Sequence, residues 1–262
     1  MSSHDQRKGV GPLLVVPALL LIVLFAGLGT WQVFRLQWKL DLIARVDARV
    51  HAAPVAPPPE ARWGSISSTS DEYRHVALSG AYLYDLTTPV QALTEEGSGY
   101  WLLTPMCTPD GQIILVNRGF IPSALGAPTR YARTQASPGT DACAHAGART
   151  TITGLLRISE PGGMFTRAND PTANRWYSRN VAQIAAARGL AGKVAPYFVD
   201  AARGQNPPES PDQPVGGLTV VNFPNSHLVY AITWYALALM AGGALWWVAR
   251  GQHRAVRTGI DE

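Results

Sequence analysis

Residues 224–249 read PNSHLVYAITWYALALMAGGALWWVA, and the fold class follows from this stretch. Beyond His227 it contains no ionisable side chain except tyrosine, and a helix rising ~1.5 Å per residue over this length can cross the hydrocarbon core of a bilayer. Asn225 or Ser226 can cap the start of such a helix, because their short polar side chains accept hydrogen bonds from free backbone amides. The stretch predicts a transmembrane helix with His227 at the membrane edge.

A second uncharged apolar run extends from Gly11 to about Phe34, near the N-terminus. Basic residues precede it, as they do in a secretory signal peptide. The run is longer than the core of a signal peptide, however, and no clean small-x-small cleavage site closes it. These features favour a retained transmembrane helix over a cleaved signal.

Charged residues are sparse in this chain, at 15%, and the net charge is +4. Many of the basic residues flank the two apolar runs, which is a membrane pattern. No basic stripe is interleaved with aromatic residues, so nucleic acid is excluded as a partner. Arg250, Arg254 and Arg257 follow the second run and place the C-terminus in the cytoplasm, whereas the first run has basic residues on both sides and gives no clear orientation.

Two spans with this orientation divide the chain into six segments. They are a cytoplasmic N-terminus at 1–11, a transmembrane helix at 12–34, an amphipathic helix end and Pro-rich linker at 35–59, an extracytoplasmic domain at 60–222, a transmembrane helix at 227–249, and a cytoplasmic C-terminus at 250–262.

Strand signals dominate the middle segment. Residues 100–107 and 112–118 flank Pro109-Asp110-Gly111, whose composition is typical of a β-hairpin turn. Further strands are expected at 73–84, 150–158, 196–199 and 218–221, one helix at 181–188 between Asn180 and Gly189, and loops at 122–149 and 201–217. The predicted fold is a membrane protein in which two antiparallel transmembrane helices flank an extracytoplasmic, mainly antiparallel β domain of α+β or barrel-like architecture.

Helical spacing places His227, Tyr230 and Trp234 on one face of the second span. Trp31, Gln32 and Arg35 lie at the exit of the first span, and antiparallel spans bring this exit to the same membrane face. Aromatic side chains and snorkelling cations at a membrane interface also explain both segments. An imidazole at the edge of a span is either a ligand or an interfacial helix cap.

Other reactive groups are few. Cys107 and Cys143 either form a disulfide or are two separate thiols, and their spacing matches no zinc, c-type haem or dithiol motif. Cys143 and His145 alone make a weak metal site compared with an ordinary loop. The sequence contains no phosphate-binding loop, nucleophile elbow or His-Glu-x-x-His helix, and therefore no recognisable catalytic set.

Four short blocks resemble the Surfeit locus protein 1 family of cytochrome c oxidase assembly factors. They are Gly29-Thr30-Trp31-Gln32 with Arg35, Leu36, Trp38 and Lys39; Val116-Asn117-Arg118-Gly119-Phe120-Ile121-Pro122; Arg175-Trp176-Tyr177; and Pro224-Asn225-Ser226-His227-Leu228 with residues 230–235. The family usually has Asn where Ser226 stands and often Asp where Asn180 stands. The loop 122–149 matches no family block.

The resemblance implies a non-enzymatic assembly factor that binds haem a transiently and assists its insertion into oxidase subunit I. By position, His227 is the axial ligand of the haem iron. Trp31 and Trp234 are expected to stack on the macrocycle, and Arg35 or Arg118 to pair with the propionates. Tyr230 and Gln32 complete the expected binding set.

The implied partners are subunit I, other assembly factors including haem a synthase, and the lipid bilayer. The short N-terminus favours the bacterial inner membrane, with the main domain in the periplasm, over the mitochondrial inner membrane. Two other classes remain open: a scaffold that holds subunit I without binding haem, and a membrane-anchored enzyme.

Overall fold

The computed structural model describes residues 12–125, 130–131, 135–136, 141–164, 166–219, 221 and 223–257. The expected cytoplasmic segment 1–11, much of the expected loop 122–149 and the end of the chain, 258–262, lie outside these residues. The chain forms two compact units. One unit comprises Met1–Arg45 with Asn222–Glu262, and the other comprises Val46–Val221.

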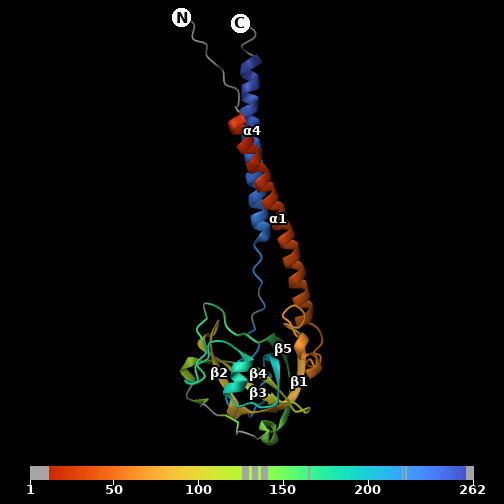
Figure 1. Ribbon diagram of the computed structural model, residues 1–262, viewed down its shortest axis with the longest axis vertical. Coiled ribbons are helices and arrows are strands. Elements are labelled where there is room, and N and C mark those ends of the chain that lie inside the picture. The colour runs from red at the N-terminus through yellow and green to blue at the C-terminus, as the bar shows by residue number, and fades with distance from the viewer. Residues whose placement is uncertain are drawn as a thin grey trace. The chain divides into compact units, whose positions relative to one another are not determined.

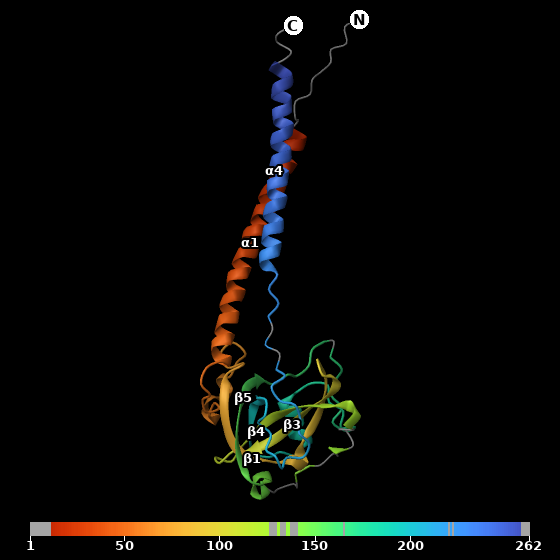
Figure 2. The ribbon, with the colours of Figure 1, turned by 180° about the vertical axis from the view of Figure 1, so that it is seen from behind.

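Two long helices form the described part of the first unit: α4 (His227–Arg257) and α1 (Pro12–Val50), whose last five residues belong to the second unit. They run side by side in opposite directions in both views (Figures 1 and 2). Both are long and apolar enough to cross a membrane, over Leu14–Val50 and His227–Arg250. Helix α1 continues well past the expected end of the span at Phe34, because no Gly or Pro follows that residue before Pro54.

The helix pair is held by small and aromatic residues on facing sides. A Cβ atom on Gly29 would lie 2.9 Å from the Tyr235 ring, so the absence of a side chain allows the helices to approach closely. Thr30 Oγ1 and the Tyr235 hydroxyl form a hydrogen bond of 2.9 Å between the helices. Because lipid offers no hydrophobic driving force between helices, such packing and polar contacts hold the pair together.

The second unit is built on a six-stranded sheet in the spatial order β1-β5-β6-β4-β3-β2. The strands are β1 (His75–Tyr82), β2 (Thr88–Thr94), β3 (Gly97–Cys107), β4 (Gln112–Pro122), β5 (Arg149–Ile158) and β6 (Lys193–Ala201). Additional pairing of β1 with β3 closes five of these strands into a barrel, and β2 extends the sheet beyond β3 (Figure 1). Every pairing is antiparallel except that of β4 with β6. The predicted barrel-like, mainly antiparallel domain is confirmed.

Side-chain alternation along the strands separates two cores. Ile114 and Val116 belong to one buried cluster with Tyr197 and Val199, whereas Leu115, between them, joins a second cluster. Successive residues of a strand point to opposite faces, so β4 is buried on both sides. The second cluster contains Val181 and Ile184 of helix α3 (Val181–Ala187), which covers the outer face of the barrel.

Most of the expected elements of this unit are present. The hairpin around residues 109–111 joins β3 and β4, and the strands expected at 73–84, 150–158 and 196–199 correspond to β1, β5 and β6. Strand β2 was not predicted. The prediction of a strand at 218–221 is wrong, because the described residues of that stretch do not pair with a strand. The apolar run there is short, and a short apolar run does not specify strand pairing.

Cys107, at the end of β3, is joined to Cys143 by a disulfide with an S–S distance of 2.01 Å. Among the described residues there is no free cysteine. The side chain of His145 lies outside the described part of the chain, so the weak metal site suggested by Cys143 and His145 is not tested, although a disulfide sulfur does not supply the thiolate that binds metals.

Helix α3 begins where the sequence predicts. The Asn180 side chain accepts a hydrogen bond from the backbone amide of Gln183, and the chain ends the helix through Gly189 at φ +64°. Asn180→Ala is expected to lower the free energy of unfolding by about 1 kcal/mol, since one amide of the first turn loses its partner. Urea unfolding of the full chain in detergent measures this change.

The conservative variant Asn180→Asp should retain the stability of the parent chain, because a carboxylate accepts the same hydrogen bond. Equal losses for the alanine and aspartate variants would contradict the capping role.

Candidate functional site

The N-terminal end of α4 carries a polar contact to α1. His227 Nδ1 lies 2.8 Å from Gln32 Oε1, and both side chains are half-buried. Antiparallel topology predicts this encounter between the exit of the first span and the entry of the second. Of the three α1 residues expected opposite His227, Gln32 makes the contact.

The chemistry of the amide fixes the tautomer of the imidazole. An amide oxygen only accepts hydrogen bonds, so Nδ1 of His227 carries the proton and donates it to Gln32. The lone pair of a neutral imidazole is then on Nε2. Metal-ligating histidines typically donate their other ring N–H to an oxygen in this way, which orients the ring and increases its basicity. The residues present therefore suit a neutral imidazole ligand.

An aromatic layer lies two helical turns deeper on the same side of α4. The rings of Trp234 and Phe25 are stacked, with centroids 5.7 Å apart and planes 27° from parallel. Seven residues separate His227 from Trp234 and Gln32 from Phe25, so this layer repeats the polar contact about 10 Å further into the span. The sequence singled out Trp234 but not Phe25, whose role depends on the pairing of the helices.

The other predicted residues of the helix pair point outward. Trp31 and Tyr230 each have 53% of their surface exposed. The Arg35 guanidinium lies over the ring of Trp38, 4.8 Å from its centroid, on the same helix. In the described part of the chain, no hydrogen bond, ion pair or ring contact joins these three side chains to His227, so their roles stay predictions.

Asn225, just before α4, presents a buried side-chain oxygen with no hydrogen-bond partner among the described residues. The backbone carbonyl of Ser226 accepts the first helical hydrogen bond, from Tyr230, but no side-chain cap from Asn225 or Ser226 is seen in the described helix start. An unpaired buried acceptor is costly. Asn225 thus adds an acceptor close to His227.

Arg118 lies in the second unit and is fully buried. Its Nε donates to Asn206 Oδ1 at 3.2 Å, and its Nη2 donates to the carbonyl oxygen of Pro211 at 2.6 Å. Its guanidinium also lies 4.8 Å from the centroid of the Tyr84 ring. These contacts tie the loop at 206–212 to β4. The expected propionate contact of Arg118 stays a prediction that its burial does not favour.

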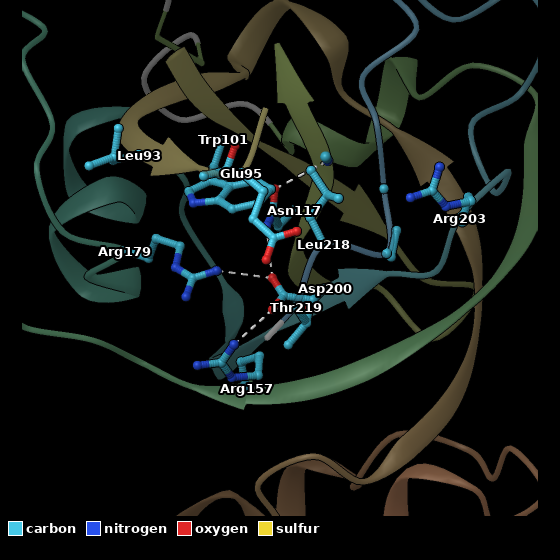
Figure 3. Close-up of a pocket in the computed structure, with 15 residues that line it drawn as sticks. Leu93, Glu95, Trp101, Asn117, Arg157, Arg179, Asp200, Arg203, Leu218 and Thr219 are labelled. Carbon is cyan, nitrogen blue, oxygen red and sulfur yellow. Dashed lines mark hydrogen bonds and ion pairs between the residues drawn. The ribbon is translucent and has the colours of Figure 1, made fainter. Parts of the chain in front are cut away.

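The second unit contains a pocket of about 500 Å³ on the outer face of the barrel (Figure 3). Its floor is the carboxylate of Asp200, of which 4% is exposed. Asn117 and Arg179 donate to Oδ1 at 2.8 and 3.1 Å, and Arg157 and Thr219 donate to Oδ2, both at 2.9 Å. Asp200 therefore links β6 to β4, to β5 and to two segments outside the sheet.

Two further carboxylates surround the arginines. Glu160 accepts from Arg157 at 2.9 Å and from Arg179 at 2.7 and 2.9 Å, and Glu72 accepts from Arg157 at 3.0 Å. Burial alone would lower the pKa of the Arg157 guanidinium, but Asp200, Glu72 and Glu160 outweigh burial and raise this pKa. Both arginines also lie over the Phe198 ring. Arg157 therefore stays charged, and each of the two guanidinium groups is held by several hydrogen bonds.

None of Asp200, Arg157 and Arg179 was singled out by the sequence. A weak signal is present, because Asp200 lies in the otherwise uncharged stretch 194–201 and Arg157 lies between Leu156 and Ile158. Charged residues are seldom buried unless paired, so two opposite charges in neighbouring apolar strands indicate an ion pair. Their partners Arg179 and Glu160 lie in irregular segments, where the sequence offers no equivalent pattern.

The sequence matches the model of the SURF1 family over residues 19–239, from the first span into the second. The chain belongs to the SURF1 family. Membership implies a role in cytochrome c oxidase assembly, and members of the family are assembly factors.

Three relatives show how far the similarity extends. Surfeit locus protein 1 of Homo sapiens is 34% identical over 245 residues, which cover 87% of this chain and 74% of the relative. A SURF1-like protein of Monosiga brevicollis is 34% identical, with 81% and 78% covered, and one of Drosophila melanogaster is 32% identical, with 94% and 80% covered. The range that matches the family includes most of the first candidate membrane helix and about half of the second.

The structure gives the third sequence block of the SURF1 family a structural role. Trp176 is buried, and its indole N–H donates to Asn174 Oδ1 at 3.0 Å. Its backbone carbonyl accepts from Gln91 of β2 at 2.8 Å and so covers part of the outer edge of that strand. Through Trp176, this block covers part of the sheet edge at β2 and so protects backbone groups that would otherwise be unpaired.

Asp200→Asn is expected to lower the free energy of unfolding by about 3 kcal/mol or more, because two buried guanidinium groups lose a carboxylate partner. Unfolding of the full chain in detergent, followed by tryptophan fluorescence, measures this loss. The matched variant Asp110→Asn changes the same group in the exposed turn between β3 and β4 and should alter stability by no more than about 0.5 kcal/mol. Equal effects of the two substitutions would refute the structural role of Asp200.

Proposed function

We propose that this protein binds haem a at the edge of the membrane through His227 and assists its insertion into subunit I of cytochrome c oxidase. The observation that carries this proposal is the hydrogen bond from His227 Nδ1 to Gln32, which leaves Nε2 to bind iron. Neutral imidazole is a common ligand of haem iron. Gln32 and His227 both lie within residues that match the family.

The surroundings of His227 suit an amphipathic macrocycle. Trp234 and Phe25, stacked deeper in the span, offer apolar surface to the ring and to the isoprenoid tail of haem a. Arg35 lies almost one turn further along α1 than Gln32, in the direction away from the apolar run. Its guanidinium suits a propionate, because it can donate two parallel hydrogen bonds to a carboxylate.

A site with a single protein ligand suits temporary binding. The haem a synthase that supplies the group and the subunit I that receives it are both proposed partners, and the lipid bilayer is the medium through which the exchange takes place. His227 holds the group through one coordinate bond, so the neighbouring contacts set how readily it leaves. Gln32 fixes the orientation of that bond.

We also propose that the chain resides in the bacterial inner membrane with both termini in the cytoplasm and the β domain in the periplasm. The basic residues that follow α4 support a cytoplasmic C-terminus. The disulfide between Cys107 and Cys143 supports an oxidising compartment for the domain.

A scaffold without haem is the second candidate function. In that case the imidazole of His227 serves only to join α4 to α1, and the β domain holds subunit I. The hydrogen bond to Gln32 is compatible with this role too. The two functions differ in whether Nε2 binds iron.

His227→Ala is expected to abolish the visible absorption of haem a that copurifies with the full chain from cells making this haem, because the axial ligand is lost. Leu228→Ala, which shortens an exposed neighbour on the same helix, should leave the spectrum unchanged. A parent chain without haem would exclude direct binding and favour the scaffold.

Gln32→Leu removes the acceptor and keeps the approximate size of the side chain. This variant is expected to weaken haem a binding about ten-fold, as loss of an outer-sphere hydrogen bond does at other metal-binding histidines. Gln32→Glu retains an acceptor and should bind haem a more tightly than Gln32→Leu. A leucine variant with unchanged affinity would show that Gln32 does not orient the ligand.

The proposed placement is tested with reporter fusions. Alkaline phosphatase, which is active only outside the cytoplasm, should be inactive when fused after residue 262, whereas a green fluorescent protein at that point should fold and emit. The reverse pattern would place the C-terminus outside and overturn the orientation inferred from the basic residues.

A further inference from the structure

The pocket beside Asp200 belongs to neither the helix pair nor the proposed haem site. It lies wholly within the second unit, and its volume of about 500 Å³ falls in the range of known ligand sites. Figure 3 shows side chains from the strands and from the segment after β6 converging on it. Its lining combines the aromatic ring of Trp101 and the apolar side chains of Leu93 and Leu218 with charged groups.

The charges on the pocket floor are already paired. Asp200 accepts four hydrogen bonds, and Arg157 and Arg179 each use three N–H groups to bind carboxylates. These groups form a network within the protein and give the floor its shape. With Glu72 and Glu160 the network contains three carboxylates and two guanidinium groups, so it carries a net charge of about −1.

Two charged side chains at the rim are not paired. Glu95, at the turn between β2 and β3, and Arg203, which follows β6, both line the pocket and are exposed. Neither takes part in an ion pair or a side-chain hydrogen bond among the described residues. In Figure 3 the carboxylate of Glu95 is directed toward Asp200, and Arg203 lies on the other side of the pocket. The pocket thus presents a free negative group and a free positive group at separate places.

Backbone groups complete the wall. Gly216, Gly217 and Leu218 line the pocket, and the amide of Gly217 is bound to the carbonyl of Ala201 at 3.0 Å. The backbone amides of Gly216 and Leu218 have no hydrogen-bond partner in the portion of the chain that the structure describes. Free backbone groups along a segment are what an extended peptide pairs with when it binds a protein edge.

We propose that this pocket binds an extended polypeptide segment of a partner protein, with a basic side chain against Glu95 and an acidic side chain against Arg203. Trp101 packs against the stem of the basic side chain, since an indole attracts a guanidinium or ammonium group. Opposite free charges select a ligand that carries both signs and reject ligands with one sign repeated. The site is independent of haem binding by His227.

The test uses the full chain in nanodiscs and short synthetic peptides whose binding is followed by saturation-transfer NMR. The probes are acetyl-Arg-Ala-Ala-Glu-amide, its reverse acetyl-Glu-Ala-Ala-Arg-amide, and analogues in which Gln replaces one or both charged residues. One of the two dipolar peptides is expected to bind about three- to five-fold more tightly than each single-charge analogue, the size of an exposed ion pair.

Protein variants assign each charge to its partner. In the Glu95→Gln variant, the Arg of the peptide should no longer increase affinity, whereas the Glu of the peptide still should. The Arg203→Gln variant should show the reverse. Each protein–peptide charge pair should therefore show coupling in a double-mutant cycle. Glu96→Gln changes the neighbouring exposed carboxylate, which does not line the pocket, and should change no affinity. Both pocket residues lie at the rim, and unchanged thermal unfolding of the variants confirms that they fold.

Three results would overturn the proposal: no dipolar peptide binds more tightly than the neutral one, the peptide charges show no coupling to Glu95 and Arg203, or Glu96→Gln acts as strongly as Glu95→Gln. Loss of haem binding in His227→Ala leaves this measurement unaffected, and so the two proposals fail separately.

Discussion

The carboxylate of Asp200 is the interaction on which the second unit depends. Its four donors come from β4, from β5, from the segment before α3 and from the segment after β6, so a single side chain on β6 joins parts of the chain far apart in sequence. A buried carboxylate without partners is strongly disfavoured, and each donor offsets part of the cost of removing it from water. Any arrangement that separated these segments would leave a buried charge unpaired. Thr219, which precedes α4 in the sequence, is therefore held against the barrel by its hydrogen bond to Asp200.

The parts of the fold that the sequence predicts are those governed by local periodicity and turn chemistry. Pro109-Asp110-Gly111 specifies a hairpin, Asn180 and Gly189 delimit α3, and two apolar runs specify long helices. Strand β2 was missed because Pro89 lies within it, and a proline argues against a strand unless the strand is at an edge. The stretch at 218–221 was mistaken for a strand because it is apolar, although Thr219 is held by a side-chain contact to Asp200. Contacts with residues far away in the sequence determine the structure of both segments, and such contacts cannot be read from a short stretch of sequence.

In the candidate site, too, some features could be predicted from the sequence and others depend on long-range contacts. Opposed spans predict that Trp31, Gln32 and Arg35 lie at the same membrane face as His227, Tyr230 and Trp234, because topology brings the two helix ends together, and Gln32 and His227 are the pair in contact. The rotation of each helix about its axis was not predictable, and it decides which neighbours join them. Close approach at Gly29 to the ring of Tyr235 sets this rotation, so Phe25 faces Trp234 while Trp31, Arg35 and Tyr230 turn outward. A glycine in an apolar run has many possible causes, and its partner on the other helix is visible only in the structure.

Two arginines illustrate why similar residues in the two units cannot be given one role. Arg118 lies in one of the four blocks that match the family. Its guanidinium is bound within the protein, where it donates to backbone carbonyls and lies over the ring of Tyr84. Arg35 lies in another such block, yet it is exposed, and among the described residues its ring contact is with Trp38 of its own helix. A guanidinium already held by carbonyl groups loses those hydrogen bonds if it turns to a ligand, whereas one on a helix surface loses little. The difference in burial therefore indicates different roles. Buried Arg118 stabilises the fold, whereas exposed Arg35 is able to bind a carboxylate, although both lie in blocks that match the family.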